Sequence, residues 1–210
     1  MRFWSDSFAD GDAMPTQFGF GKYNPETHVE LSDNLNPHFA WSDLPEGTKS
    51  LVLICYDVDV PTKPDNVNKE GMTVPADLPR AGFYHWVCVD LPTEPAEVKE
   101  GEFSSGITVG GKESAGPRGT RQGINDYTSW FAGDEDMKGT YRGYDGACPP
   151  WNDEIVHHYH FTLHATDFER FPVEGDFTGD EVKQAMQGHV LAEANIVGTY
   201  HIYPDAIVKS

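Results

Sequence analysis

The chain has 210 residues and carries 34 acidic against 15 basic side chains, a formal net charge of −19. This excess of acid argues against nucleic acid and against a polybasic membrane contact as general partners. The three cysteines are too few and too uneven for a disulfide framework, no apolar run is long enough for a membrane span, and the first residues lack a signal-peptide pattern. A cytoplasmic protein with no transmembrane segment is therefore expected.

Three strands are predicted in the middle of the chain. Residues 51–60 and 83–91 are nearly continuous apolar runs rich in β-branched side chains, the pattern of strands that are buried on both faces. Residues 157–165 alternate instead. The face that contains His157 and Phe161 is the apolar one, so it is expected to point to the core.

One helix and one further strand follow. Thr178 and Glu181 have the spacing of a capping box, which predicts a helix over 179–188. Residues 190–202 then alternate between apolar and mostly polar side chains, as a half-buried terminal strand would. Residues 191–194 are also compatible with a longer helix.

Two long segments, 62–82 and 104–143, are rich in glycine, proline and polar residues and show no sustained period. Loops of this length in a compact domain are usually functional or are structured by their own side chains. Strong strands lie on both sides of them, and no linker composition separates two cores. We therefore expect a single domain over residues 1–210, with these segments as inserted loops.

The chemically informative residues lie at strand ends and on an apolar strand face. Asp57 and Asp59 share a face by alternation. There they either bind a group such as a histidine, an ammonium or a metal, or they simply form a solvated strand end. His85 lies on the same face as Val87, either as a core histidine or as part of a site. With His157 and Asp57 it would form a pocket that donates hydrogen bonds to an anion, because a carboxylate favours the charged imidazolium.

Three histidines on the polar face of the third strand raise the possibility of zinc: His158, His160 and His164. Imidazole is a suitable zinc ligand. However, no cysteine or carboxylate lies at ligand spacing beside them, so we expect a solvated or partner-facing surface and no metal.

The cysteines have different settings. Cys55 and Cys88 lie in the two buried strands, on opposite faces by alternation, and are expected to be buried and unpaired. Cys148 lies in a Cys-Pro-Pro loop. It is either part of a rigid turn or, with His157 and Asp57, a nucleophilic Cys–His–Asp set.

Several motifs occur together in a fixed order. Residues 57–61 read Asp-Val-Asp-Val-Pro, residues 85–87 read His-Trp-Val, and residues 125–127 read Asn-Asp-Tyr. Residues 143–150 contain Gly-Ala-Cys-Pro-Pro, and residues 157–159 read His-His-Tyr. The set resembles the signatures of the phosphatidylethanolamine-binding protein family, in its bacterial Raf kinase inhibitor-like (YbhB/YbcL) branch.

The resemblance implies a mainly β fold, an antiparallel β-sandwich with a few peripheral α-helices. It implies a non-enzymatic binding protein with a pocket for a small anion or a phosphorylated head group, without a cofactor. The pocket residues carried over are Asp57, Asp59, Pro61, His85, Pro149, His157 and Tyr159. The chain departs from the signatures at Val58, Val60 and His158 and by a longer segment, 151–156, before the second histidine.

The resemblance also supplies finer expectations. His85 and His157 are expected to donate to the anion, and Asp57 to orient a histidine or accept from a cationic group. The Val60–Pro61 peptide bond is expected to be cis, although most bonds before proline are trans.

Two other functions stay open besides the binding protein. One is a regulator that inhibits a kinase or a protease through its surface, and the other is a hydrolase that uses Cys148. A homodimer is also expected, because members of this branch often form one.

Overall fold

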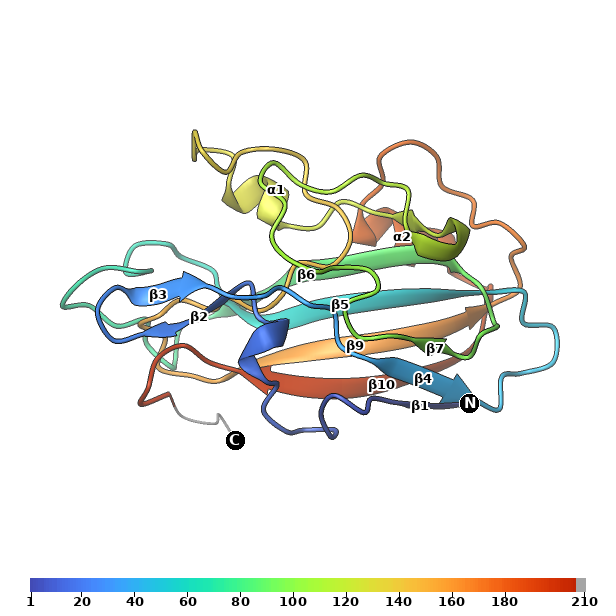
Figure 1. Cartoon of the computed structure of the whole chain (residues 1–210), viewed down its shortest axis with the longest axis horizontal. Coiled ribbons are helices and arrows are strands. Elements are labelled where there is room, and N and C mark those ends of the chain that lie inside the picture. Colours follow the sequence, from blue (N-terminus) through green and yellow to red (C-terminus); the bar gives the residue numbers. More distant parts are fainter. Residues whose placement is uncertain (207–210) are drawn as a thin grey trace.

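Antiparallel strands make up most of the structure, a computed structural model that describes residues 1–206 (Figure 1). The central sheet has the strand order β10–β9–β5–β6–β8, and a smaller sheet has the order β1–β4–β7. Strands β2 and β3 form a separate hairpin. This mainly β, antiparallel architecture with few helices confirms the predicted fold class.

The elements have the following bounds. The central sheet consists of β5 (Ser50–Pro61), β6 (Arg80–Leu91), β8 (Arg121–Gln122), β9 (His157–Thr166) and β10 (Val190–Tyr200). The other strands are β1 (Arg2–Trp4), β2 (Gly21–Asn24), β3 (His28–Leu31), β4 (Phe39–Ser42) and β7 (Glu97–Val98). The helices are α1 (Tyr127–Trp130) and α2 (Gly179–Ala185), with short 3-10 turns at Thr16–Phe18 and Pro117–Gly119. Within residues 1–206, no helix has the length and apolar character needed to cross a membrane.

The predicted strands are confirmed, with different ends. β5 and β9 closely match the predicted ranges, whereas β6 begins earlier, at Arg80. β10 ends at Tyr200 rather than at residue 202. Residues 191–194 belong to this strand, so the longer helix is excluded.

Helix α2 begins as its sequence predicts. Thr178 Oγ1 accepts a hydrogen bond from the Glu181 amide, and the Glu181 carboxylate accepts one from the Thr178 amide at 2.8 Å. The helix ends at Ala185, before the predicted end at residue 188. Gly188 has a φ of 81°, a left-handed conformation that glycine adopts without a steric penalty, and β10 begins two residues later, at Val190.

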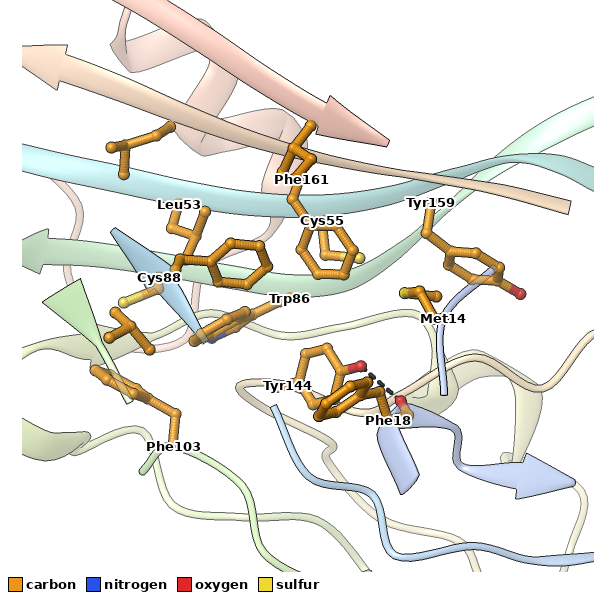
Figure 2. Close-up of a cluster of buried hydrophobic side chains, with 14 of the residues drawn as sticks. Met14, Phe18, Leu53, Cys55, Trp86, Cys88, Phe103, Tyr144, Tyr159 and Phe161 are labelled. Atoms are coloured by element: carbon orange, nitrogen blue, oxygen red, sulfur yellow. Dashed lines mark hydrogen bonds between the residues drawn. The ribbon is translucent and has the colours of Figure 1, made fainter. Parts of the chain in front are cut away.

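Apolar cores cover the central sheet on both faces. On one face its side chains pack with those of the smaller sheet in a large core that includes Trp86 and Phe161 (Figure 2). On the other face Ile54 and Val87 pack with Val182 of α2. Because both faces of β5 and β6 are covered, consecutive residues of these strands are apolar.

A β-bulge in β6 changes which side chains share a face. Cys55 of β5 pairs with Trp86, and the next residue, Tyr56, pairs with Tyr84. His85 is therefore the extra residue of the bulge. A bulge of this kind changes the direction of a side chain relative to its neighbours.

The bulge accounts for two wrong expectations. His85 does not share its face with Val87, which packs in the core beneath α2. Cys55 and Cys88 lie in the same core rather than on opposite faces (Figure 2). Both are nevertheless free thiols, as predicted.

The expectation of a cis bond at Val60–Pro61 is wrong. Among the residues that the structure describes, the cis peptide bond is Glu94–Pro95. β5 continues through Pro61, which pairs with Arg80 of β6. Pro61 is therefore part of an extended, paired strand.

Candidate functional site

A pocket of about 370 Å³ is lined by residues of the β2–β3 hairpin, of the loop between β5 and β6, of α1 and of the central sheet. Figure 1 shows where these elements lie in the fold. Its walls are mostly apolar. They include Phe20, Val29, Leu31, Val67, Phe83, Tyr127, Trp130, Phe131 and Pro150. A cluster of polar side chains from β5, β6 and β9 interrupts these walls, and we call Asp57, His85, His157 and Tyr159 the polar cluster.

The pocket brings together all but one of the site residues predicted from the sequence. Those that line it are Asp57, Pro61, His85, Pro149, His157 and Tyr159. The exception is Asp59, which does not line the pocket.

Asp59 does not share a face with Asp57, because the pairing of β5 with β6 shifts between Asp57 and Val60. The Asp57 carboxylate accepts a hydrogen bond from the Asp59 amide at 2.7 Å. The Asp59 carboxylate instead accepts from the amide and from Nδ1 of His158, at 2.9 and 2.8 Å. Asp59 therefore holds the start of β9 on the side away from the pocket.

The polar-face histidines of β9 are engaged separately. His158 binds Asp59, and Nδ1 of His164 lies 3.5 Å from the Glu193 carboxylate. Within residues 1–206, no group of three or more histidine, cysteine, aspartate or glutamate side chains is arranged to hold a metal ion.

His157 lies between two carboxylates and is fully buried. Its Nδ1 is 2.8 Å from Asp57 Oδ2, and its Nε2 is 3.1 Å from Asp153 Oδ2. Burial lowers the pKa of His157, but Asp57 and Asp153 raise it by more than burial lowers it. The pKa of His157 therefore rises from its ordinary value of 6.5 to about 9. The ring is therefore an imidazolium that donates to both carboxylates. The expectation that His157 donates to a ligand is not met, because both of its N–H groups are already used.

Asp153 is in turn held by Arg80. The guanidinium donates to both carboxylate oxygens, at 2.6 and 3.0 Å, and the two side chains are almost fully buried. Asp57, His157, Asp153 and Arg80 thus form a row of alternating charges with a net charge of zero. Burial raises the pKa values of Asp57 and Asp153, but the neighbouring cations lower them more, so both carboxyls stay ionised.

His85 has a different environment. Its Nδ1 lies 2.8 Å from the carbonyl oxygen of Asp145, and since a carbonyl only accepts, Nδ1 carries the proton. Burial lowers the pKa of His85 more than Asp57 and Asp145 raise it, so the ring is neutral near pH 7. Its Nε2 is then an acceptor, and among the described residues it has no hydrogen-bond partner.

Asp145 fixes the position of His85 and is itself fully buried. Its carboxylate accepts from Lys112 Nζ at 2.6 Å, Asn34 Nδ2 at 2.9 Å and Asn125 Nδ2 at 2.8 Å. Three donors satisfy a buried carboxylate that would otherwise be costly. None of these four residues was expected in the site from the sequence, although Asn125 and Asp145 both lie in the motifs.

Tyr159 offers a second unused polar group. Its ring packs edge-on to His85, with ring centres 5.1 Å apart. Its hydroxyl is buried and has no hydrogen-bond partner among the described residues. Burial raises the pKa of Tyr159 well above its usual value, so the hydroxyl stays protonated and can both donate and accept. Figure 2 shows the ring at the end of the core cluster, with its hydroxyl directed away from Phe161.

Cys148 also lines the pocket, and its side chain packs near Gly21. Burial raises the pKa of the Cys148 thiol to about 12, so it is not a thiolate at neutral pH. Both nitrogens of His157 bind carboxylates, so neither is free to serve as its base. The Cys–His–Asp set considered from the sequence is therefore not assembled.

The loop 62–82 is tied to the segment 151–156. Asn152 Oδ1 accepts from the Asn68 amide at 3.0 Å, and its Nδ2 donates to the carbonyl oxygens of Asn66 and Met72 at 2.9 and 3.0 Å. Asn68 Oδ1 in turn accepts a hydrogen bond from the Trp151 amide at 3.0 Å. These contacts fix the loop as one wall of the pocket.

A family model and several known relatives match this chain over most of its length. The family model described as "Phosphatidylethanolamine-binding protein" matches residues 4–201. The chain is 33% identical over 200 residues to the Escherichia coli (strain K12) UPF0098 protein YbhB, covering 95% of this chain and 99% of that protein. It is 30% identical to a UPF0098 protein of Aquifex aeolicus over 95% of this chain and 88% of the relative.

Solved structures agree with the sequence comparisons. The crystal structure of Escherichia coli YbcL, described as a member of the mammalian PEBP family, superposes with a TM-score of 0.65 at 26% identity, covering 95% of this chain and 97% of that one. A homologue from Chlamydia trachomatis superposes with a TM-score of 0.62 at 26% identity and covers 95% of both chains. This chain belongs to the phosphatidylethanolamine-binding protein family.

Proposed function

We propose that this protein is a non-catalytic binding protein whose pocket holds a small molecule through an anionic group such as a phosphate. The observation that carries the proposal is the pair of unused polar groups in the polar cluster, Nε2 of His85 and the hydroxyl of Tyr159. A buried polar group such as the Tyr159 hydroxyl normally has a partner, so it favours a ligand with a matching group, and Nε2 of His85 supplies an acceptor in the same pocket lining. The apolar walls favour an uncharged body attached to that anionic group.

The protonation states of the two groups favour a singly protonated anion. A phosphate monoanion has a P–OH group that donates to neutral His85 and a charged oxygen that accepts from Tyr159. The four-residue charge row sums to zero, so it does not oppose one negative charge. A fully deprotonated anion instead requires His85 to take up a proton, against its lowered pKa.

The environment of Cys148 supports a binding role over hydrolysis. Its thiol has a raised pKa, and the neighbouring histidine that would serve as base is bound on both nitrogens. We also propose a reducing compartment such as the cytoplasm, because all three thiols are unpaired. Regulation of a kinase or a protease and assembly into a homodimer stay predictions from the family resemblance.

Native mass spectrometry and calorimetry test the proposal. The purified protein is expected to retain a small anionic molecule, and inorganic phosphate is expected to bind at about one site per chain. His85→Ala should weaken phosphate binding by about 1–3 kcal/mol, the usual range for a hydrogen bond to a charged group. His160→Ala, on the opposite face of β9, is the matched control and should bind phosphate as the wild type does. Equal loss in both variants would place the site elsewhere.

A further inference from the structure

We propose that Asp153, held by Arg80, is a positioning residue that matches the charge of the His157 imidazolium and so sets the anion selectivity of the pocket. The consequence for the ligand rests on the proposed function. The effect on His157 does not, and it is measured separately.

The geometry of Asp153 is that of a shared acceptor. Its Oδ2 lies 2.6 Å from Arg80 Nη1 and 3.1 Å from His157 Nε2, and its Oδ1 lies 3.0 Å from Arg80 Nη2. The Asp153 side chain is 1% exposed and that of Arg80 is 7% exposed. Charges this deeply buried are tolerated only when they are paired, so removing either partner leaves a charge uncompensated.

Without Asp153, one carboxylate, that of Asp57, would remain beside two buried cations, His157 and Arg80. Asp57 binds only Nδ1, so Nε2–H would lose its carboxylate partner and the row would carry one unmatched positive charge. With Asp153 in place, Nε2 is occupied and the positive charge of the ring is matched. The ligand then meets the neutral ring of His85 beside a charge row that sums to zero, rather than beside a row with one excess positive charge.

Arg80 connects this arrangement to the pocket wall. Besides Asp153, its guanidinium donates to the carbonyl oxygens of Asp59 and Pro75, both at 2.9 Å. Pro75 belongs to the loop 62–82, other residues of which line the pocket. Asp153 itself lies in the segment 151–156, the part of the chain that is longer than the family signature. The proposal therefore assigns a role to a feature that the family motifs leave unexplained.

The charged groups that face His157 from each neighbouring element determine whether a substitution raises or lowers the net charge around it. β5 contributes Asp57, the segment 151–156 contributes Asp153, and β6 contributes Arg80 and the neutral His85. Replacing Asp153 with a neutral side chain raises the net charge of the row by one. Replacing Arg80 with a neutral side chain lowers it by one.

The test compares Asp153→Asn and Arg80→Gln by histidine NMR titration and by sulfate calorimetry near pH 6, where His157 stays protonated. Histidine NMR titration should give a lower pKa for His157 in Asp153→Asn and a higher one in Arg80→Gln. Calorimetry with sulfate should show binding about three- to tenfold tighter in Asp153→Asn and weaker by a similar factor in Arg80→Gln. Damage to the fold alone would weaken binding in both variants.

Matched controls carry the same charge changes at exposed positions. Glu169→Gln and Arg170→Gln should leave the His157 pKa and sulfate affinity within error of the wild type. Arg80→Lys keeps the charge and should restore most of the affinity lost in Arg80→Gln, and it remains informative if Asp153→Asn does not fold. An unchanged His157 pKa in both Asp153→Asn and Arg80→Gln would overturn the proposal. Shifted pKa values without sulfate or phosphate binding to any variant would keep the positioning role and refute the proposed function.

Discussion

His85 and Asp145 are joined by two hydrogen bonds. The Asp145 amide donates to the carbonyl oxygen of His85 at 3.0 Å, and the Asp145 carbonyl accepts from Nδ1 of His85 at 2.8 Å. The second bond fixes the tautomer of the ring, so the nitrogen left for a ligand is Nε2. A residue of the segment between α1 and β9 thereby controls how a strand residue faces the pocket.

Lys112→Ala tests this support. The lysine ammonium is the one cation that binds the Asp145 carboxylate in the described part of the chain, at 2.6 Å. Its removal leaves a buried carboxylate with two amide donors, and we expect the free energy of unfolding to fall by about 3–5 kcal/mol. Urea denaturation measures the loss. Lys99→Ala, at an exposed position, should change it by less than about 0.5 kcal/mol, and an equal loss in both variants would contradict the role of Lys112.

Sulfate binding should weaken as the pH rises. Sulfate keeps two charges, so it requires His85 as an imidazolium, whereas burial lowers the pKa of the free ring against the opposing influence of Asp57, Asp126 and Asp145. Binding is therefore coupled to the uptake of up to one proton, and affinity should fall by at most about tenfold per pH unit. Calorimetry at about pH 5.5 and about pH 7.5 measures the change.

The control variants for this prediction separate His85 from the other histidines. His85→Gln should bind sulfate weakly at both pH values, with little pH dependence. His160→Ala should retain the dependence of the wild type. A pH dependence that survives in His85→Gln would assign the proton to another group.

The sequence predicts most of the strands because their apolar patterns reflect how many faces are covered. β9 alternates since one face lies in the core, whereas β5 and β6 are apolar throughout since both faces are covered. The same reasoning fails at the bulge in β6. There, His85 adds one residue to the strand, and the face assignments of the residues that follow, including Cys88, are reversed until a second register shift before Leu91.

The polar residues around the pocket were only partly predictable. Asp57, His85 and His157 could be assigned to the site because they lie in predicted strands and in the family motifs. Asp153 binds Arg80 across 73 positions of the chain, and Asp145 binds Lys112 across 33. These partners lie largely in loops without a period, so nothing local in the sequence indicates that they meet.

Gly146→Ala should destabilise the protein strongly. A Cβ atom at residue 146 would lie 2.1 Å from the carbonyl oxygen of Phe18, a backbone atom that cannot move away without displacing its segment. We expect a loss of about 1–3 kcal/mol in the free energy of unfolding, the usual range for overpacking. Gly133→Ala is the matched control, because a Cβ there meets nothing within 4 Å. Equal stability of the two variants would contradict the close approach.

We propose that the chain is one cooperative domain. β5 pairs with β9 along most of its length, which joins the two halves of the sequence, and Lys112 and Arg142 tie the segment 104–143 to Asp145 and Asp176. Unfolding followed by tryptophan fluorescence and by far-UV circular dichroism should give coincident transitions. Two separable transitions, or two fragments that fold independently after a protease cut between residues 105 and 140, would contradict a single domain.

The buried charge row should make stability depend on pH in a defined direction. The pKa of His157 rises from the ordinary value of 6.5 to about 9 on folding, because Asp57 and Asp153 outweigh the effect of burial. Its contribution to stability is complete below about pH 6.5 and is lost as the pH rises through about 9, by at most about 1.4 kcal/mol per pH unit. The two aspartates have lowered pKa values, so their contribution is present at neutral pH and is lost as the solution becomes acidic.

His157→Gln provides the comparison that isolates this contribution from the other groups that titrate. Urea denaturation of both proteins at about pH 6 and about pH 9.5 gives four free energies of unfolding. The glutamine variant should be less stable at the lower pH by about 3–5 kcal/mol, since it leaves two buried carboxylates without the imidazolium. At the higher pH the gap should narrow, because the wild type has then lost most of the same charge. A gap that is constant between the two pH values would mean that His157 is neutral in the folded protein, and the alternating charge row would be wrong.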